Sequence, residues 1–131
     1  MILLDSSFLI DFVRDEEYSS FIPKNEIPVV SVISYYEIMS GIRRLRSKKE
    51  EAFFQRLFAE IEILDFTVPA AHYASTLSAR MRDAGTPVNV LDILIAATAC
   101  ASNVGKIITA DMDFDIIARF SDLQVIRYSG M

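Results

Sequence analysis

The sequence predicts an α/β fold of three layers, α/β/α, in which helices cover both faces of a central parallel sheet of about five strands. Strand-like and helix-like segments alternate along the chain, which is the order that parallel β-α-β units produce. The strand-like segments are continuous aliphatic runs, as expected for a sheet buried on both faces. With 131 residues, of which 52% are hydrophobic, the chain can bury such a core. We therefore expect one domain over residues 1–131.

The first half of the chain begins with a short aliphatic strand at residues 2–4, which ends at Asp5. Apolar residues at three- and four-residue spacing then predict a helix over residues 7–14. A second aliphatic run predicts a strand at residues 29–32. The same helical spacing predicts helices over residues 35–46 and 48–60.

The second half repeats this alternation. Aliphatic runs bounded by polar or turn residues predict strands at residues 61–64, 106–109 and 124–127. Helical spacing predicts helices over residues 69–84, 90–103 and 113–120. The stretch from residue 90 is rich in alanine and indicates a buried helix.

The formal net charge of −5 argues against a protein that holds nucleic acid by general electrostatic attraction, because such domains are usually basic. Any contact with nucleic acid must be local. The basic cluster "RRLRSKK" contains Arg43, Arg44 and Arg46. It is either a solvated helix end, which the helix dipole favours, or a weak RNA-binding patch.

The sequence also predicts the compartment. The amino terminus lacks a basic leader, and the longest apolar stretch is too short and carries Asp92, so we expect no membrane segment and a cytoplasmic protein. The single Cys100 makes neither a disulfide framework nor a zinc site, and we expect it to be a small buried side chain. The sole histidine, His72, lies away from the strand ends and is expected to be structural or at the surface.

Four of the acidic residues have a possible structural role when each is considered alone. Asp5 follows the first strand and suits the N-cap of the next helix. Glu37 lies three residues after Ser34, which is the spacing of a capping box, and Asp92 lies three residues after Asn89 in a weaker version of the same box. Asp111 suits the cap of the last helix.

Three aspartates stand at alternate positions in "KIITADMDFDII", namely Asp111, Asp113 and Asp115. Taken together with the other acids, they follow the first, second and fourth predicted strands, and Asp92 begins a helix that can flank the same crevice. Carboxylates that meet there without cations would raise one another's pKa values. A hard divalent ion such as Mg²⁺ or Mn²⁺ is the natural complement of such a group.

The segments that carry these acids resemble, in order, the motifs of PIN-domain ribonucleases, and most closely those of VapC-type toxins of toxin–antitoxin pairs. "ILLDSSFLID" is similar to the opening segment, with Asp5 and the hydroxyl neighbour Ser6. "PVVSVISYYEIMSGIRR" is similar to the second segment and carries Glu37, although Ser34 stands where threonine is frequent. "LDILIAATA" resembles the third segment with Asp92, and "IITADMDF" resembles the fourth with Thr109, Asp111 and Asp113. Asp115 falls after this pattern and is assigned to the surface.

The resemblance implies an endoribonuclease that depends on Mg²⁺ or Mn²⁺, cleaves RNA with metal-activated water, and leaves a 5′-phosphate and a 3′-hydroxyl. It implies catalytic roles for Asp5, Glu37, Asp92 and Asp111, and metal ligation by Asp5, Asp92, Asp111 and Asp113. Ser6 and Thr109 would support the site by positioning water or a ligand, or would act only as cap and strand-end hydroxyls.

Three alternative functions remain open from the sequence. The chain resembles housekeeping RNA-processing PIN nucleases as well as toxins. A receiver-like signalling domain also has acids at strand ends, but Asp5 is followed by serines, and the last strand ends in Arg127 and Tyr128 where a receiver carries lysine. The third alternative is an interaction domain of the same fold without catalysis.

The surplus of apolar residues predicts protein partners. Five of them, in the helix over residues 48–60 and just after it, form an arc too wide for one narrow stripe: Phe53, Phe54, Leu57, Phe58 and Ile61. We therefore expect a homodimer and a hydrophobic groove beside it for a cognate antitoxin, whose amphipathic helix would place a basic side chain among the acids.

Overall fold

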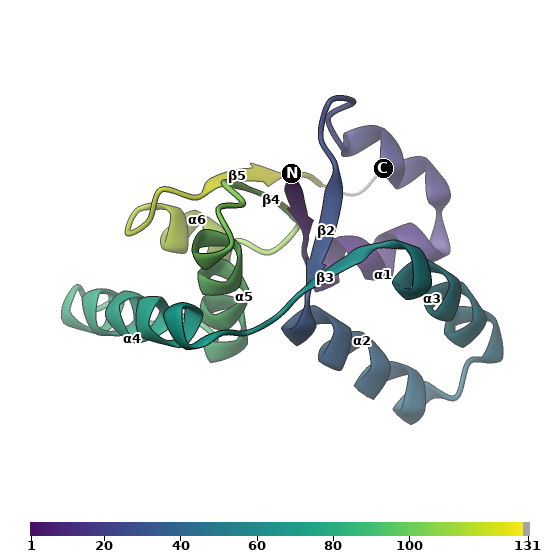
Figure 1. The fold of residues 1–131 in the computed structure, drawn as a ribbon, viewed down its shortest axis with the longest axis horizontal. Helices are drawn as coiled ribbons and strands as arrows, with labels where there is room; N and C mark the ends of the chain where they lie inside the picture. Colours follow the sequence, from purple (N-terminus) through teal and green to yellow (C-terminus); the bar gives the residue numbers. More distant parts are fainter. Residues whose placement is uncertain (130–131) are drawn as a thin grey trace.

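The structure is a computed structural model, and it describes residues 1–129. Its centre is a five-stranded sheet, β3-β2-β1-β4-β5, in which every neighbouring pair is parallel (Figure 1). The predicted α/β class and parallel sheet are confirmed. The strands are β1 (Ile2–Leu4), β2 (Pro28–Ser31), β3 (Glu62–Leu64), β4 (Lys106–Thr109) and β5 (Gln124–Arg127).

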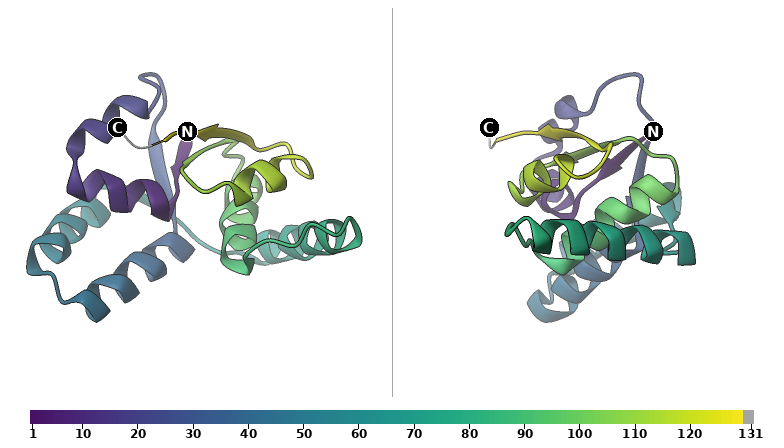
Figure 2. Two further views of the ribbon diagram at one scale, coloured as in Figure 1. Left: turned by 180° about the vertical axis from the view of Figure 1, so that it is seen from behind. Right: turned by 90° about the vertical axis from the view of Figure 1, so that its left-hand side faces the viewer.

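Helices cover both faces of the sheet, as the three-layer prediction requires. Figures 1 and 2 show α1, α2 and α3 on one side of the sheet and α4, α5 and α6 on the other. The helices are α1 (Ser6–Arg14), α2 (Val32–Leu45), α3 (Lys48–Glu60), α4 (Val68–Asp83), α5 (Val90–Ala101) and α6 (Asp113–Ala118).

Alternate residues of the central strands enter two separate apolar clusters. Leu3 and Ile107 pack with side chains of α4, α5 and α6. Leu4 and Ile108 pack with α1, α2 and α3 on the opposite face. This alternation explains why the strands read as continuous apolar runs, because both faces of each strand are buried.

The strand order creates a switch point between β1 and β4. From β1 the chain proceeds outward to β2 and β3, then returns to place β4 on the other side of β1. In open parallel sheets, ligand sites form beyond the carboxyl ends of the strands at such a point. Asp5 follows β1 directly and Asp111 lies two residues beyond the end of β4, so they flank it. A receiver-like domain would have the order 2-1-3-4-5, so that alternative is wrong.

Most predicted boundaries agree with the structure to within one or two residues. The exception is α2, which begins at Val32 and not at residue 35. A 3₁₀-helix over Glu16–Phe21, η1, was not predicted because its short polar sequence has no helical stripe of apolar residues. Within residues 1–129, no helix combines the length and the hydropathy that crossing a bilayer would need.

The apolar arc of α3 lies mostly against its own domain. Phe54 is buried at 2% exposure, and the other members of the arc are partly buried against the same cluster: Phe53, Leu57, Phe58 and Ile61. Much of the arc thus packs within its own domain, against α1 and α2 among others, and the homodimer stays a prediction. Cys100 is half-buried, not buried as expected.

Candidate metal centre

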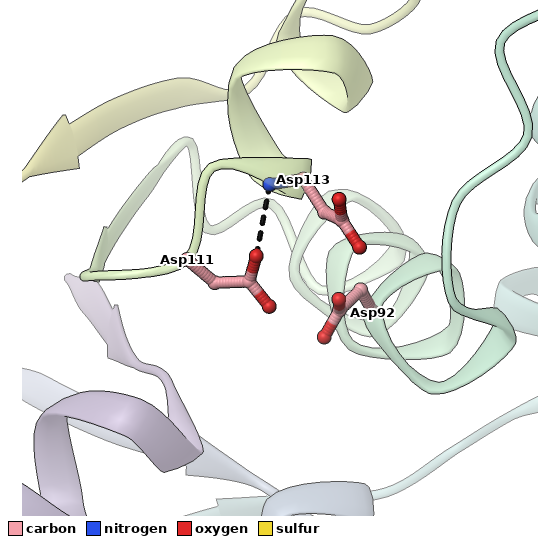
Figure 3. A group of neighbouring side chains, drawn as sticks. All are labelled: Asp92, Asp111 and Asp113. Atoms are coloured by element: carbon pink, nitrogen blue, oxygen red, sulfur yellow. Dashed lines mark hydrogen bonds between the residues drawn. The ribbon is translucent and has the colours of Figure 1, made fainter.

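Three carboxylates converge at the carboxyl edge of the sheet. One oxygen each from Asp92, Asp111 and Asp113 can be chosen so that all lie within 4.8 Å of one another. Asp92 comes from the first turn of α5, whereas the other two come from the loop after β4 and the start of α6. Figure 3 shows the three side chains pointing toward a common space. This spacing suits oxygen ligands around one divalent cation.

Asp113 is placed by Asp111. The backbone N–H of Asp113 donates to Oδ1 of Asp111 at 2.9 Å (Figure 3). The N-cap of α6 is Met112, which makes no side-chain cap bond, so Asp111 is not the cap that the sequence predicted. Its bond to Asp113 is an Asx turn just before the helix, and it coexists with a position in the carboxylate group. On the facing helix, Asn89 Oδ1 accepts from the N–H of Leu91 at 2.8 Å and so caps α5 by itself.

Asp5 lies beside this trio and is buried at 3% exposure. Its Oδ2 accepts hydrogen bonds from Thr109 Oγ1 at 2.7 Å and from Ser7 Oγ at 2.8 Å. Asp5 occupies the N-cap position of α1 without a side-chain cap bond. The carboxylate is therefore held by hydroxyls from β4 and α1 instead of serving the helix end.

Glu37 lies on the other side of the crevice, on α2. Its Oε1 accepts from Ser6 Oγ at 2.7 Å. The capping-box interpretation is wrong, because the N-cap of α2 is Ser31, whose Oγ accepts from the N–H of Ser34 at 3.0 Å. Glu37 thus lies beyond the first turn of α2, too far from the unpaired N–H groups of the helix start to cap them.

The pKa values of three crevice acids are raised, as expected for carboxylates that lie together without a neighbouring positive charge. Burial, followed by the charges of Asp111 and Asp5, raises the pKa of Asp92 to about 8. Burial raises the pKa of Asp5 against the lowering effect of its Thr109 and Ser7 hydrogen bonds. Burial also raises the pKa of Glu37, with smaller contributions from the charges of Asp5 and Asp111. Among residues 1–129, no lysine or arginine forms an ion pair with these acids.

The structure brings both predicted supporting hydroxyls into the crevice and adds one that sequence reasoning missed. Ser7 Oγ contacts Asp5, lies 3.2 Å from Thr109 Oγ1, and accepts from the N–H of Ala110 at 3.1 Å. The sequence does show a second hydroxyl residue, Ser7, two positions after Asp5, and this could have indicated a second supporting group. It was missed because only the adjacent Ser6 matched a known pattern.

The remaining predicted residues lie outside the crevice. Asp115 is exposed and pairs with Arg127 at 2.9 Å, so its assignment to the surface is confirmed. His72 is exposed on α4. The cluster of Arg43, Arg44 and Arg46 is exposed at the far end of α2.

Comparisons with known proteins agree with this architecture. The family model of the PIN domain matches residues 2–120. No curated protein matches the chain by sequence. Among solved structures, VapBC2 from Rickettsia felis bound to a promoter DNA fragment is similar at a TM-score of 0.81 and 21% identity, with 98% of this chain and 100% of that chain covered.

Two further structures are similar at higher identity. VapBC-5 from Mycobacterium tuberculosis, a member of the VapBC family of toxin–antitoxin systems, matches at a TM-score of 0.78 and 25% identity, with 96% and 97% of the two chains covered. FitAcB from Neisseria gonorrhoeae matches at a TM-score of 0.78 and 25% identity, with 97% of each chain covered.

Proposed function

The chain belongs to the PIN domain family, and from this membership and its carboxylate crevice we propose that it is a divalent-metal-dependent endoribonuclease, the toxin of a toxin–antitoxin pair. The observation that carries the proposal is the convergence of Asp92, Asp111 and Asp113 within 4.8 Å, with Asp5 and Glu37 beside them. Buried acids that raise one another's pKa values destabilise a fold unless a cation offsets them. The similarity to VapBC structures supports the toxin assignment.

Mg²⁺ or Mn²⁺ fits this donor set, because both are hard cations that prefer carboxylate oxygens. Asp92, Asp111 and Asp113 would hold the ion. When bound, it would supply the positive charge that activates a water molecule and offsets charge on the phosphate. The hydroxyls of Ser7 and Thr109 fix the orientation of Asp5, which therefore presents its charge to the crevice without rotating.

Glu37 is suited to accept a proton from the attacking water. Its raised pKa brings it closer to neutral pH than an ordinary glutamate, which favours general-base catalysis. Ser6 holds one oxygen of Glu37 at 2.7 Å, so the other oxygen is left for the proton. No protein nucleophile is required for phosphodiester hydrolysis by water.

A groove next to the crevice could receive the proposed antitoxin, because Glu37 is one of its lining residues. A groove of about 130 Å³ lies between α1, α2 and α3, with Glu37 at its border. Apolar side chains and two arginines are among its lining residues, which include Ile10, Arg14, Ile38, Gly41, Arg44 and Phe54. An amphipathic helix in this groove would bring a basic side chain toward Glu37.

The test is cleavage of a mixed RNA pool by the purified chain with Mg²⁺, Mn²⁺ or EDTA. We expect cleavage only with a metal ion, with 5′-phosphate and 3′-hydroxyl ends, and loss of cleavage in Asp5→Asn and Glu37→Gln. The matched control is Asp115→Asn, which removes a carboxylate from the same segment outside the crevice. Cleavage in EDTA, or full activity of Asp5→Asn, would contradict the proposal.

A readout without RNA is the melting temperature. Saturating Mn²⁺ at a hundred times its Kd adds about 2.7 kcal/mol to the free energy of unfolding. Asp92→Asn should abolish most of this gain, whereas Asp115→Asn should retain it. If Mn²⁺ leaves the melting temperature of the unsubstituted chain unchanged, the proposed metal site is wrong.

A further inference from the structure

The outermost face of α2 forms a stripe that leads away from the acid crevice. Tyr36, Ser40 and Arg43 follow one another at four- and three-residue spacing, so they lie on one side of the helix. All three are exposed, and the opposite side of α2 is buried in the core. Arg43 lies seven positions after Tyr36, which is about 10 Å along the helix axis. Figure 1 shows α2 starting at the end of β2 and running outward from the sheet.

The far end of this stripe carries a concentration of positive charge. Five of the 13 lysine and arginine residues lie within seven positions, and all are exposed: Arg43, Arg44, Arg46, Lys48 and Lys49. Within the described chain, none of them pairs with a carboxylate. A chain with a net charge of −5 and an acidic crevice repels RNA at long range, so attraction must come from a local patch of this kind.

Arg46, one of these five basic residues, has an unusual backbone conformation. It terminates α2 in the left-handed conformation, with φ of 56°. Glycine is favoured there, because a side chain at Cβ makes this conformation unfavourable. The helix dipole favours a positive charge at this end of α2, but it does not remove the backbone cost of the left-handed conformation, and a contact of the guanidinium group with RNA would offset that cost.

Tyr36 marks the near end of the stripe. It is 63% exposed and adjoins Glu37, whereas its neighbour Tyr35 is held edge-on against Phe58 at a centroid distance of 4.9 Å. Within the described chain, no other aromatic ring contacts Tyr36. An exposed ring without a partner is a surface on which an unpaired base can stack.

We propose that this stripe, together with Arg46 at the end of α2, is the path along which single-stranded RNA approaches the crevice. Tyr36 stacks on a base beside the cleaved phosphate, and the two arginines hold phosphates farther along the strand. The inference rests on the proposed function and adds to it the residues that would receive the substrate strand. The path suits an unpaired strand, because bases within a duplex are not free to stack on a side chain. The stripe is distinct from the groove proposed for the antitoxin, whose lining includes neither Tyr36 nor Arg43.

The test measures binding of a labelled single-stranded RNA, and of the corresponding duplex, to the full chain carrying Asp5→Asn in Mg²⁺. We expect Tyr36→Ala to weaken single-strand binding by about fivefold to a hundredfold, and Tyr36→Phe to retain it, because the ring alone stacks. Arg43→Gln and Arg46→Gly should each reduce the slope of log affinity against log salt by about 0.7. If Asp5→Asn does not fold, the unsubstituted chain in EDTA serves instead.

Two controls separate a path for RNA from a structural effect. Lys24→Gln removes an exposed charge from the loop before β2, at the amino-terminal end of the strands and thus opposite the crevice. It should leave the slope of log affinity against log salt unchanged. Arg46→Gly should keep or raise the melting temperature while binding weakens, because glycine relieves the left-handed cap. Weaker binding that merely follows lost stability would contradict the proposal.

Other outcomes overturn the inference and leave the proposed function standing. If the unsubstituted chain cleaves RNA with Mn²⁺ while Tyr36→Ala and Arg43→Gln bind and cleave like their parent, the path lies elsewhere. Equal binding of duplex and single strand would also overturn it. If Tyr36→Ala spares RNA binding but abolishes association with the antitoxin, the stripe is a protein interface. Failure of the unsubstituted chain to cleave any RNA would instead refute the proposed function.

Discussion

At the scale of single residues, the crevice is organised by hydroxyl groups as much as by acids. Asp5 is buried at 3% exposure, and a buried carboxylate is costly unless it is hydrogen-bonded. Ser7 and Thr109 supply these bonds, and Thr109 Oγ1 also accepts from the N–H of Asp111 at 2.9 Å. The two hydroxyls therefore link the segment after β1 to the end of β4 and the loop that follows it; Asp5 and Thr109 are 104 residues apart in sequence.

We predict that Ser7→Ala lowers the free energy of unfolding by about 1 kcal/mol or more, because it leaves the N–H of Ala110 without its acceptor and removes a donor from Asp5. Urea unfolding in EDTA measures this loss. Ser6→Ala is the matched control and should cost less, since within residues 1–129 the Ser6 hydroxyl bonds to Glu37 and to no other group. Equal losses in the two variants would show that Ser7 has no special position.

Asp92 makes the stability of the metal-free chain depend on pH. Burial and the charges of Asp111 and Asp5 raise its pKa to about 8, against about 3.9 in an unfolded chain. Between these values the folded state keeps a proton that the unfolded state has released. Stability is therefore greatest at low pH in this window and falls as the pH rises, by up to about 1.4 kcal/mol per unit.

We therefore predict that the melting temperature in EDTA falls as the pH is raised from 5 to 8, and that Asp92→Asn makes this dependence shallower. The slope should not vanish, because the pKa values of Asp5 and Glu37 are raised as well. Thermal scans across this range measure the effect. If the melting temperature of Asp92→Asn falls as steeply with pH as that of the unsubstituted chain, or more steeply, the pKa of Asp92 is not raised in the folded state.

At the scale of elements, α2 determines where Glu37 lies, and its start is set by Ser31. Ser31 is completely buried and caps the helix by accepting from the N–H of Ser34. The corresponding cap of α3 is Ser47, which accepts from the N–H of Glu50 at 3.3 Å. The two caps have the same chemistry, but only α2 carries a side chain into the crevice.

We predict that Ser31→Ala and Ser47→Ala each lower the free energy of unfolding by about 1 kcal/mol, the usual effect of losing a serine N-cap. Only Ser31→Ala should also slow RNA cleavage, because a frayed start of α2 moves Glu37. Denaturant unfolding and cleavage rates on the same preparations test both parts. Equal activity of the two variants would show that the first turn of α2 does not position Glu37.

The elements themselves were largely predictable, whereas the details at the crevice were not. Continuous aliphatic runs located all five strands, and helical spacing located the six α-helices, because burial on two faces leaves a strong pattern. The start of α2 was placed three residues late because Ser31 and Ser34 are both good caps, and local chemistry does not choose between them. The role of Ser7 was not predictable from a motif, and two of its partners, Thr109 and Ala110, are distant in sequence.

At the scale of the whole molecule, the exposed apolar side chains bear on assembly. With α3 packed against its own core, the prediction of a homodimer depends on other surfaces. Val68 and Val90 are 84% and 59% exposed at the first positions of α4 and α5, and Met112 is 68% exposed between two of the crevice aspartates. Large apolar side chains exposed at the starts of successive helices are candidates for an interaction surface.

We predict that the chain forms a homodimer at tens of micromolar and that Val68→Lys together with Val90→Lys converts it to a monomer, because each lysine would bury an unpaired charge in the contact. Light scattering measures the mass of each form. The matched control is Ile27→Lys, which alters a side chain that is 67% exposed just before β2, at the opposite edge of the sheet, and should remain dimeric. A strict monomer before substitution, or an unaffected dimer in the double variant, would remove this surface from the assembly. The antitoxin groove would be unaffected by that result, because it is lined by α1, α2 and α3 and contains neither valine.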